Sequence, residues 1–438
     1  MSVHNKLIVI VGAYSTGQYL APAFISRGYQ CIHVQPGAAI GSFYLDSFRQ
    51  QDFINNFVWD GDDEPIIQEL SKFDIKAVIP GSEIAVLLAD RLSQKLSLPT
   101  TNDPKLSCAR RNKYDMQKAL EHAGVNSIPV FKTNKSESIF HWLKSQGIQY
   151  PIVLKPLASA GTDGVSICQN QEEVQLAFNE LIDTVNALGE NNSELLVQPY
   201  LHGIEYVVNT VSSNGRHYVT EIIRVNKITI NASPVYDYAE VLSPVEHELL
   251  YELLTEYVKK VLDALGIQFG AGHSEVMLVN ETTSVLIETA ARPIGGIDLS
   301  AYTESLGYNH ISMVAESYLN PENFHQILLP ENKLPLRKRL LCTFMISPIH
   351  GEICNRPDLM AIKNLPHVHS VLMKTQGVLE KTSTLINCPG FITSLGTNRE
   401  ELMQQHQKIR QYEPHLFLQM VDSTIGVKEV SCEQPMMS

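Results

Sequence analysis

The chain has 438 residues, which is enough for two to four domains of ordinary size. Apolar residues make up 44% of it and charged residues 18%, a composition typical of globular proteins and not of disordered or fibrous ones. Acidic residues outnumber basic ones by 47 to 34, which argues against the basic surface that nucleic-acid binding requires. We therefore expect small molecules as partners and no nucleic acid.

The seven cysteines include no C-x-x-C pair, so they predict neither a disulfide framework nor a zinc site, and they indicate a reducing compartment. The N-terminal apolar run ends at Gly12 and is too short for a secretory signal. No stretch reaches the ~18 apolar residues of a membrane span. These features predict a cytoplasmic protein with no membrane partner.

The first hundred residues predict a parallel α/β domain. Residues 6–12 form an apolar strand, and a glycine turn and a helix lead from it to a second strand at 29–36. A strand at 75–80 and a helix over 81–96 repeat the pattern. The glycines of the first turn are spaced G-x-x-x-x-G, which is not the dinucleotide fingerprint, and no P-loop lysine follows. This spacing predicts a tight turn that lies above a bound substrate, and it argues against a nicotinamide site.

Turn-forming residues around 99–108 mark the first domain boundary. Beyond it, strands at 151–156 and 165–170 flank a glycine loop, and an amphipathic helix is predicted over 171–189 before a strand at 194–201. The expected domains are 1–105, 106–200, 201–335 and 336–438.

The third expected domain contains a long helix. Ser243 to Glu246 reads as a capping box with proline at the first helical position, and the apolar pairs that follow predict a helix ending at Gly266. From residue 336 onward the pattern indicates strands and a helix, which form a smaller α+β lobe.

The segment 273–296 carries the most specific signal. Two β-branched runs are separated by residues 280–283, so the segment reads as a hairpin. In that register Glu275 lies opposite Glu288, and His273 lies opposite Ala290. Alternation along the strands places His273, Glu275, Met277, Leu286, Glu288 and Ala290 on one face and Val276, Leu278, Val285 and Ile287 on the other.

Directly opposed carboxylates destabilise a sheet unless a cation lies between them. Magnesium is commonly bound by one or two carboxylates together with substrate phosphates. The pair therefore predicts a metal and nucleotide site, and the alternative is an exposed hairpin whose glutamates point into water.

Lys155 lies inside the apolar run 151–156, on the opposite face from Ile152 and Leu154. A buried ammonium needs an anionic partner, and phosphate is a suitable one. The loop that follows, 157–164, can present backbone N–H groups to phosphate oxygens, since its glycines allow the conformations that such a nest requires. Taken alone, this pattern is also that of a surface lysine followed by a hairpin turn.

Together these pieces resemble a known family. RNKYDM with Lys113, VLKP with Lys155 and the SAGTDG loop, LVQPYLHGIEY, and GHSEV with LIETAARPIGG stand in the order and spacing of ATP-grasp carboxylate–amine ligases. The resemblance covers roughly residues 1–430, and ETAARPIGG is most similar to enzymes that join unprotected L-amino acids into dipeptides. It implies an α/β and α+β ATP-grasp fold, with an N-terminal parallel-sheet domain, a central lid subdomain and a C-terminal mixed lobe.

The resemblance also implies ATP and two Mg²⁺ ions as cofactors, with Mn²⁺ as a possible substitute, and a homodimer. It implies these roles: Lys113, Lys155 and the loop residues Ser159, Gly161, Thr162 and Gly164 at the phosphates, Gln198 at the adenine amino group, Tyr200 and Leu201 as the hinge against the base, Glu205 at the ribose, Glu275 and Glu288 as metal ligands, and Arg292 at the carboxylate or acyl phosphate.

One position departs from the family pattern. Many ATP-grasp enzymes have an asparagine metal ligand two residues after the second glutamate, where this chain has Ala290. The predicted register puts His273 opposite, where it could take that place, hydrogen-bond the substrate or bond an internal carbonyl. Arg292, Lys155 and His273 are therefore the catalytic candidates.

The implied reaction transfers the γ-phosphoryl group of ATP to a carboxylate and lets an amine attack the resulting acyl phosphate, which yields ADP, phosphate and an amide. The sequence does not specify the acid or the amine. Two other interpretations remain open at this point: a carboxylase-type or purine-pathway ATP-grasp enzyme, and a protein that binds ATP without turnover.

Overall fold

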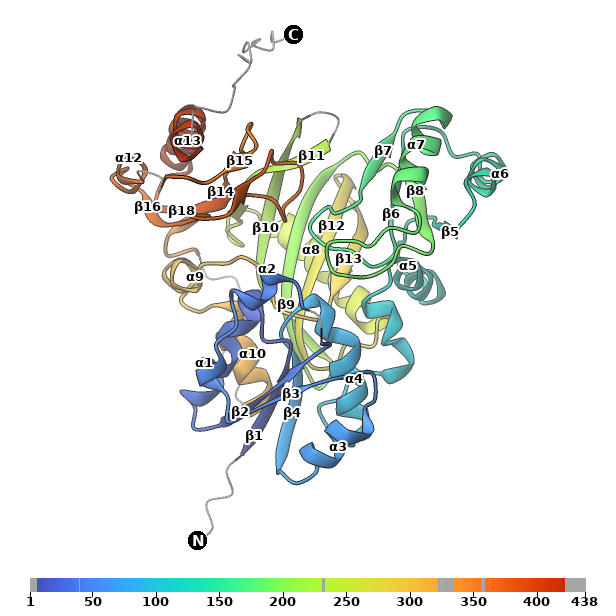
Figure 1. The fold of residues 1–438 in the computed structure, drawn as a ribbon, viewed down its shortest axis with the longest axis vertical. Coiled ribbons are helices and arrows are strands. Elements are labelled where there is room, and N and C mark those ends of the chain that lie inside the picture. The colour runs from blue at the N-terminus through green and yellow to red at the C-terminus, as the bar shows by residue number, and fades with distance from the viewer. Residues whose placement is uncertain are drawn as a thin grey trace.

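A computed structural model describes residues 6–38, 40–230, 233–321, 324, 335–355 and 359–421. Three large sheets organise the molecule (Figure 1). The N-terminal sheet lies at one end, and a long central sheet runs between two upper lobes. One of these lobes contains the second sheet, β5 (Phe131–Thr133) to β8 (Leu195–Pro199), and the other ends in the C-terminal helix α13 (Arg399–Met420).

The N-terminal sheet has the order β3-β2-β1-β4, and all of its pairs are parallel, so the predicted βαβ pattern is confirmed. Every residue of β1 is buried. A Cβ on Gly17 would overlap the carbonyl of Gly81, so the glycine of the first turn allows two strand-to-helix turns to touch. The elements are β1 (Leu7–Val11), α1 (Leu20–Ile25), β2 (Gln30–Gln35), α2 (Ser42–Leu45), β3 (Asn55–Val58), α3 (Glu64–Leu70), β4 (Ile75–Pro80) and α4 (Val86–Lys95).

The second sheet has the order β5-β8-β6-β7, and β6 and β7, the two strands predicted on either side of the glycine loop, pair in antiparallel fashion. Its helices bury Ile152 and Leu154 in an apolar cluster, while Lys155 takes the other face. The elements are α5 (Lys113–His122), β5 (Phe131–Thr133), α6 (Ser136–Gln146), β6 (Ile152–Pro156), β7 (Ser166–Cys168), α7 (Gln171–Leu181) and β8 (Leu195–Pro199).

Helix α7 is shorter than predicted and ends at Leu181 instead of continuing to 189. Its C-cap, Ile182, has an extended backbone, and Asp183 has a φ of +57°. Residues 183–192 then form a loop closed by an antiparallel bridge between Val185 and Asn191. A left-handed backbone directly after the cap turns the chain away from the helix axis.

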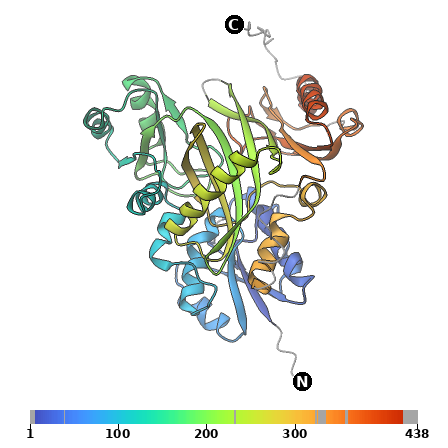
Figure 2. The ribbon, with the colours of Figure 1, turned by 180° about the vertical axis from the view of Figure 1, so that it is seen from behind.

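The central sheet has the order β13-β12-β9-β10-β11-β14-β18-β16, so strands of the expected C-terminal lobe continue the same sheet. Helix α8 (Glu248–Ala264) crosses one face of it (Figure 2). Its strands are β9 (Ile204–Ser213), β10 (Arg216–Ile230), β11 (Ser233–Val241), β12 (Gly270–Asn280), β13 (Thr283–Ala290), β14 (Arg339–Phe344), β16 (Val368–Met373) and β18 (Gly390–Gly396).

The remaining elements connect this sheet to its surroundings. Helix α10 contributes Ile311 and Val314 to the same apolar cluster as Ile8 and Phe24 of the N-terminal domain, which joins the two parts through a shared core. These elements are α8 (Glu248–Ala264), α9 (Leu299–Leu306), α10 (His310–Leu319), β15 (Gly351–Glu352), α12 (Met360–Lys363), β17 (Val378–Leu379) and α13 (Arg399–Met420).

The predicted start of α8 is wrong by one turn. Ser243 Oγ accepts a long hydrogen bond of 3.4 Å from Glu246 N, but residues 244–247 form a turn and the helix begins at Glu248. The second half of the capping box does not form, because Arg339 Nη2 lies 2.6 Å from a carboxylate oxygen of Glu246 and binds it instead.

The hairpin β12–β13 confirms that Glu275 faces Glu288 and that His273 faces Ala290. A bulge at Ile287 then shifts the register, so that Val276 pairs with Leu286. The predicted faces of two residues are therefore wrong. Leu286 packs with Val276 in the core beneath α8, and Val285 joins Ile128, Val130 and Leu196 in a cluster on the other side.

Candidate active site

Two opposed carboxylates form the centre of the site. Burial raises the pKa of Glu275 above its usual range, and the nearby carboxylates of Glu288 and Glu205 raise it further. Burial alone would also raise the pKa of Glu288, but Lys113, Lys155 and Arg292 lower it instead. Lys113 Nζ lies 2.7 Å from Glu288 Oε2. One carboxylate is therefore held ionised by cations, and the other is poised to take up a proton or a cation.

Lys155 projects from β6 toward the same carboxylates. Its side chain is buried, and its pKa is lowered to about 8 by burial and by the neighbouring Lys113, although Glu288 and Glu275 act in the opposite direction. The lysine predicted from the apolar run thus lies close to both glutamates, as expected for a shared site.

Lys227 on β10 is a further cation that the sequence analysis missed. Its Nζ lies 2.7 and 2.8 Å from the two carboxylate oxygens of Glu205 and 4.4 Å from the ring centre of Tyr236. Burial would lower the pKa of Lys227, but Tyr236, Glu205 and Glu275 raise it above its ordinary value. A lysine within a β-branched strand run is the signal that would have indicated it.

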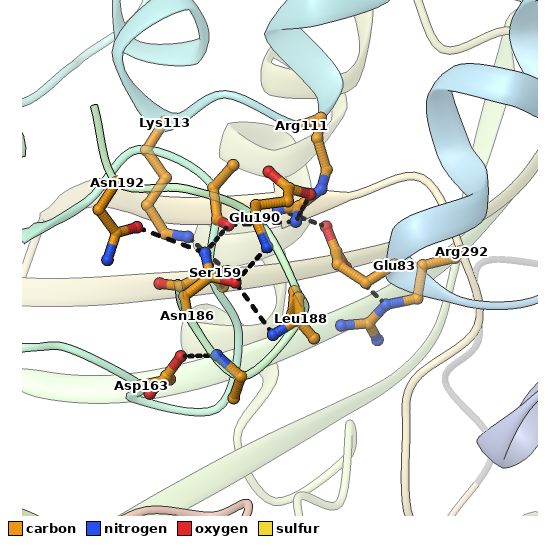
Figure 3. Close-up of polar contacts among 12 residues, drawn as sticks. Glu83, Arg111, Lys113, Ser159, Asp163, Asn186, Leu188, Glu190, Asn192 and Arg292 are labelled. Carbon is orange, nitrogen blue, oxygen red and sulfur yellow. Dashed lines mark hydrogen bonds and ion pairs between the residues drawn. The ribbon is translucent and has the colours of Figure 1, made fainter. Parts of the chain in front are cut away.

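Figure 3 shows a row of side chains of alternating charge. Arg292 Nε donates to Glu83 Oε2 at 2.8 Å, and Arg111 Nη1 lies 3.6 Å from Glu83 Oε1. Arg111 Nη2 donates to Glu190 Oε1 at 2.7 Å. Glu83 follows β4 of the N-terminal domain, and Glu190 belongs to the loop 183–192. Of these four residues, the sequence analysis identified only Arg292.

The glycine loop 157–164 is held at several points. Gly161, Thr162 and Gly164 all have left-handed backbones, with φ of +64°, +65° and +68°. The carbonyl oxygen of Ser159 accepts a hydrogen bond of 2.8 Å from Lys113 Nζ.

A second loop supports the first from outside. Asn186 Nδ2 donates to Ala158 O at 3.0 Å, and Ala187 N donates to an oxygen of Asp163 at 2.8 Å (Figure 3). Arg111 Nη2 also donates to Ala158 O, at 3.2 Å. The loop that replaces the end of the predicted helix therefore shapes the expected phosphate loop.

Four residues predicted to contact the base and the ribose follow β7 in the chain. They lie along one path from β8 of the second sheet to β9 of the central sheet. Gln198 is buried on β8 opposite Val153, and Tyr200 N donates to Pro151 O at 3.1 Å just beyond the strand. The remaining two follow in chain order: Leu201 packs in the apolar cluster with Val285, and Glu205 lies on β9 opposite Met277.

His273 lies beside the carboxylates and bonds to a side-chain carbonyl. Its Nδ1 is 2.9 Å from Asn209 Oδ1, and its Nε2 is 3.8 Å from Glu275 Oε1. Burial, and then the nearby Arg292, lower the pKa of His273 well below the usual range, which favours the neutral imidazole. Of the three roles left open by the sequence, the structure provides a bond to an internal carbonyl at Nδ1.

The donor set suits magnesium. Within the described ranges, no cluster of three or more His, Cys, Asp or Glu side chains is arranged to hold a metal ion. Two carboxylates with buried cations around them fit a cation whose other ligands are water and phosphate oxygens. None of the helices in those ranges is long and apolar enough to cross a membrane.

Comparison with known proteins agrees with this geometry. The ATP-grasp domain family matches residues 148–301. The chain is 35% identical over 424 residues to dapdiamide A synthase of Enterobacter agglomerans, covering 95% of this chain and 98% of that one. It is 23% identical over 282 residues to alanine–anticapsin ligase of Bacillus subtilis, covering 58% and 57%.

Solved structures share the fold. An L-amino acid ligase from Bacillus licheniformis superposes with a TM-score of 0.73 at 17% identity, over 94% of this chain and 98% of that one. An N5-carboxyaminoimidazole ribonucleotide synthetase in complex with ADP gives 0.67 at 16% identity, over 94% and 98%. The predicted ATP-grasp fold class is confirmed.

Proposed function

The chain belongs to the ATP-grasp carboxylate–amine ligases, ATP-dependent enzymes that form amide bonds, and on that premise we propose that it activates the carboxylate of an amino acid or amino-acid derivative and couples it to an L-amino acid. The observation that carries the proposal is the facing pair Glu275 and Glu288 with the lysines Lys113 and Lys155 beside it. The names of two relatives, a dapdiamide synthase and a ligase of alanine and anticapsin, support substrates of this class.

We assign the phosphates of ATP to Lys113, Lys155 and the glycine loop. The two ammonium groups are buried next to the carboxylates, and a polyanion would give them the partners that burial requires. The left-handed residues Gly161, Thr162 and Gly164, with Ser159 before them, would supply backbone N–H groups.

We assign the base and the ribose to the path after β7. Gln198 would meet the adenine amino group, the backbone at Tyr200 and Leu201 would lie against the base, and Glu205 would bind the ribose. Lys227 holds both carboxylate oxygens of Glu205, and each oxygen keeps a further lone pair for a hydroxyl group.

Glu275 and Glu288 would hold magnesium, as two ions, with manganese as a possible substitute. When bound, the metal supplies positive charge at the phosphate oxygens. The chain's own contribution is to fix the two carboxylates opposite each other and to keep Glu288 ionised through Lys113.

Arg292 would steady the reacting carboxylate and the acyl phosphate. Among the described residues its Nε binds Glu83 and its Nη1 binds Pro293 O, so a guanidinium with five N–H groups keeps donors for further oxygens. Because Glu83 fixes the plane of the fork, those donors are oriented before the substrate arrives.

We also propose the four domains with the boundaries expected from the sequence, a homodimer, and a cytoplasmic location without nucleic-acid partners. The glycine loop would close over ATP and exclude water that would hydrolyse the acyl phosphate.

Phosphate release tests the proposal directly. Purified protein with ATP and magnesium would be assayed across pairs of common amino acids and a panel of other small carboxylates, with hydroxylamine added in parallel to trap acyl phosphate as hydroxamate. We expect release that requires both an acid and an amine, together with hydroxamate from the acid alone. Phosphate release that requires bicarbonate would overturn the proposed reaction. So would a protein that binds ATP but releases no phosphate with any of the pairs tested.

A further inference from the structure

The glycine loop 157–164 also contacts the C-terminal lobe, through a segment that is distant in sequence. This segment joins β17 to β18, and we call it the 381–388 loop. Leu385 N donates to Gly161 O at 3.1 Å. A Cβ added to Gly161 would lie 3.2 Å from Ile386 Cγ1 and 3.5 Å from Leu385 Cβ. The C-terminal lobe therefore lies directly against the glycine loop, at a different point from the loop 183–192.

An asparagine organises the 381–388 loop from within. Asn387 Oδ1 accepts hydrogen bonds from Ser383 N at 3.0 Å and from Thr384 N at 2.9 Å. Asn387 Nδ2 donates to Lys381 O at 3.0 Å. One side chain thus bonds three backbone groups of the loop, and these bonds fix the turn that carries Leu385.

The 381–388 loop is also anchored to the lobe. Thr382 N donates to Ser347 O, and Ser347 N donates to Thr382 Oγ1, both at 2.9 Å. Leu385 packs against the apolar cluster that contains Tyr236 and Ile297. The backbone N–H group of Leu385 is therefore held in place before it meets the glycine loop.

The bond from Leu385 determines the orientation of the peptide between Gly161 and Thr162. In a trans peptide the C=O and N–H groups point in opposite directions, so a carbonyl directed at the 381–388 loop turns Thr162 N–H away from it. Thr162 Oγ1 also donates to this carbonyl, at 2.6 Å. The N–H groups of Thr162 and Gly164 donate to none of the described residues. Unpaired N–H groups in a left-handed turn are suitable donors to an anion.

We propose that Leu385, Ile386 and Asn387 are positioning residues that hold the glycine loop in its phosphate-binding conformation, so that the C-terminal lobe takes part in ATP binding. The inference rests on the proposed function in placing the phosphates of ATP at the glycine loop. Leu385 acts through the carbonyl of Gly161, Ile386 occupies the space beside its Cα, and Asn387 maintains the turn that presents both. Glycine suits position 161 because a side chain there would meet Ile386 and would strain a backbone with a φ of +64°.

Asn387→Ala tests this support without changing the glycine loop. Because it removes the acceptor for two backbone N–H groups, we expect the KM for ATP to rise about fivefold, while kcat at saturating ATP and the KM for the amine change less than about twofold. A loss of folded protein alone would lower kcat and leave the KM for ATP unchanged. Asn387→Asp keeps the accepting oxygen and should recover part of the loss. Asn355→Ala is the matched control, since Asn355 Nδ2 donates to Gln419 O at the end of α13 in the same lobe.

A double-mutant cycle tests the contact at Gly161 itself. Gly161→Ala adds a Cβ that meets Ile386, and Ile386→Ala removes the Cγ1 that it meets. We therefore expect the rise in the KM for ATP caused by Gly161→Ala to be about threefold smaller when Ile386 is replaced. Gly164→Ala is the control, because its Cβ would lie nearest to Pro156 and Leu181, and its effect should be the same in both backgrounds. Independent effects of Gly161→Ala and Ile386→Ala would overturn the proposal.

Hydrogen exchange measures the same contact without turnover. In the full chain, ADP with magnesium should slow exchange of the Leu385 amide severalfold, and Asn387→Ala should remove most of this slowing. Unchanged exchange at Leu385 while calorimetry shows ADP bound would overturn this proposal alone. Absence of phosphate release from a native protein that binds ADP would instead count against the proposed function, and the exchange result would stand.

Discussion

Replacing Glu275 with glutamine should stabilise the ligand-free protein while abolishing ligation. Burial and the opposed Glu288 raise the pKa of Glu275 from 4.5 to about 8. The unfolded chain releases this proton near pH 4.5, whereas the folded protein retains it until about pH 8. Folding stability from this group is therefore complete below pH 4.5 and falls as the pH rises toward 8. Since each pKa unit corresponds to about 1.36 kcal/mol, the loss above pH 8 amounts to a few kcal/mol.

Thermal unfolding with a chelator present, at pH 5.5 and pH 8.5, measures this loss. The glutamine variant cannot ionise, so we expect its apparent Tm to exceed that of the native protein by several degrees at the higher pH and by less at the lower pH. Magnesium with ADP should raise the Tm of the native protein more at pH 8.5, since a cation requires the ionised carboxylate. Glu281→Gln, at the exposed hairpin turn, is the control. A variant less stable than the native protein at both pH values would refute the reasoning.

Three further substitutions probe other parts of the site. Glu288→Gln should abolish ADP formation, because it removes the ionised carboxylate that we assign to the metal and that lies 2.7 Å from the Lys113 ammonium. We expect little change in the far-ultraviolet circular dichroism, and unimpaired turnover would contradict the metal assignment. Glu190→Gln weakens a half-exposed pair with Arg111, so we expect under about 1 kcal/mol of stability loss but a severalfold higher KM for ATP and faster proteolysis of the two loops, whereas unchanged KM and cleavage would contradict a supporting role. Gly164→Ala places a Cβ 2.8 Å from the Pro156 ring at a φ of +68° and should raise the KM for ATP about tenfold, whereas Gly147→Ala, also left-handed but in open space, should not; equal effects would contradict the loop assignment.

The register of the hairpin could be predicted because it depends on local information. Two apolar runs and one turn determine which residues face each other, and the turn lies close to the paired glutamates in sequence. The bulge at Ile287 could not be predicted in this way. Tyr257 Oη accepts a hydrogen bond from Leu286 N at 2.7 Å, and Gln117 Nε2 donates to Leu286 O at 2.8 Å. Side chains from α8 and α5 thus hydrogen-bond the backbone N–H and C=O groups of Leu286 next to the bulge. No local sequence pattern shows that these two side chains will lie there.

The residues missed at the site come from segments that look ordinary in isolation. Glu83 stands in the first turn of a predicted helix, where an acidic residue needs no further explanation. Glu190 comes directly after the helix that the amphipathic pattern predicted over 171–189. Their positions near Arg111 depend on how the N-terminal domain and the second sheet pack against each other. Lys155 and the glutamates were found because each breaks an apolar strand pattern at its own position.

The metal requirement follows from the charges of the assembled site. Among the described residues, the cations and carboxylates that interact there are equal in number: Lys113, Lys155, Lys227, Arg111 and Arg292 against Glu83, Glu190, Glu205, Glu275 and Glu288. With all five carboxylates ionised the ligand-free site has no net charge, and with Glu275 protonated, as its raised pKa favours, it carries one positive charge, which is fewer than a nucleotide and a substrate carboxylate require. A nucleotide and a substrate carboxylate can be buried in it only if further cations enter with them, because an uncompensated buried charge is strongly disfavoured. The facing glutamates are where those cations would bind, since their repulsion is the part of the network that remains unrelieved without them.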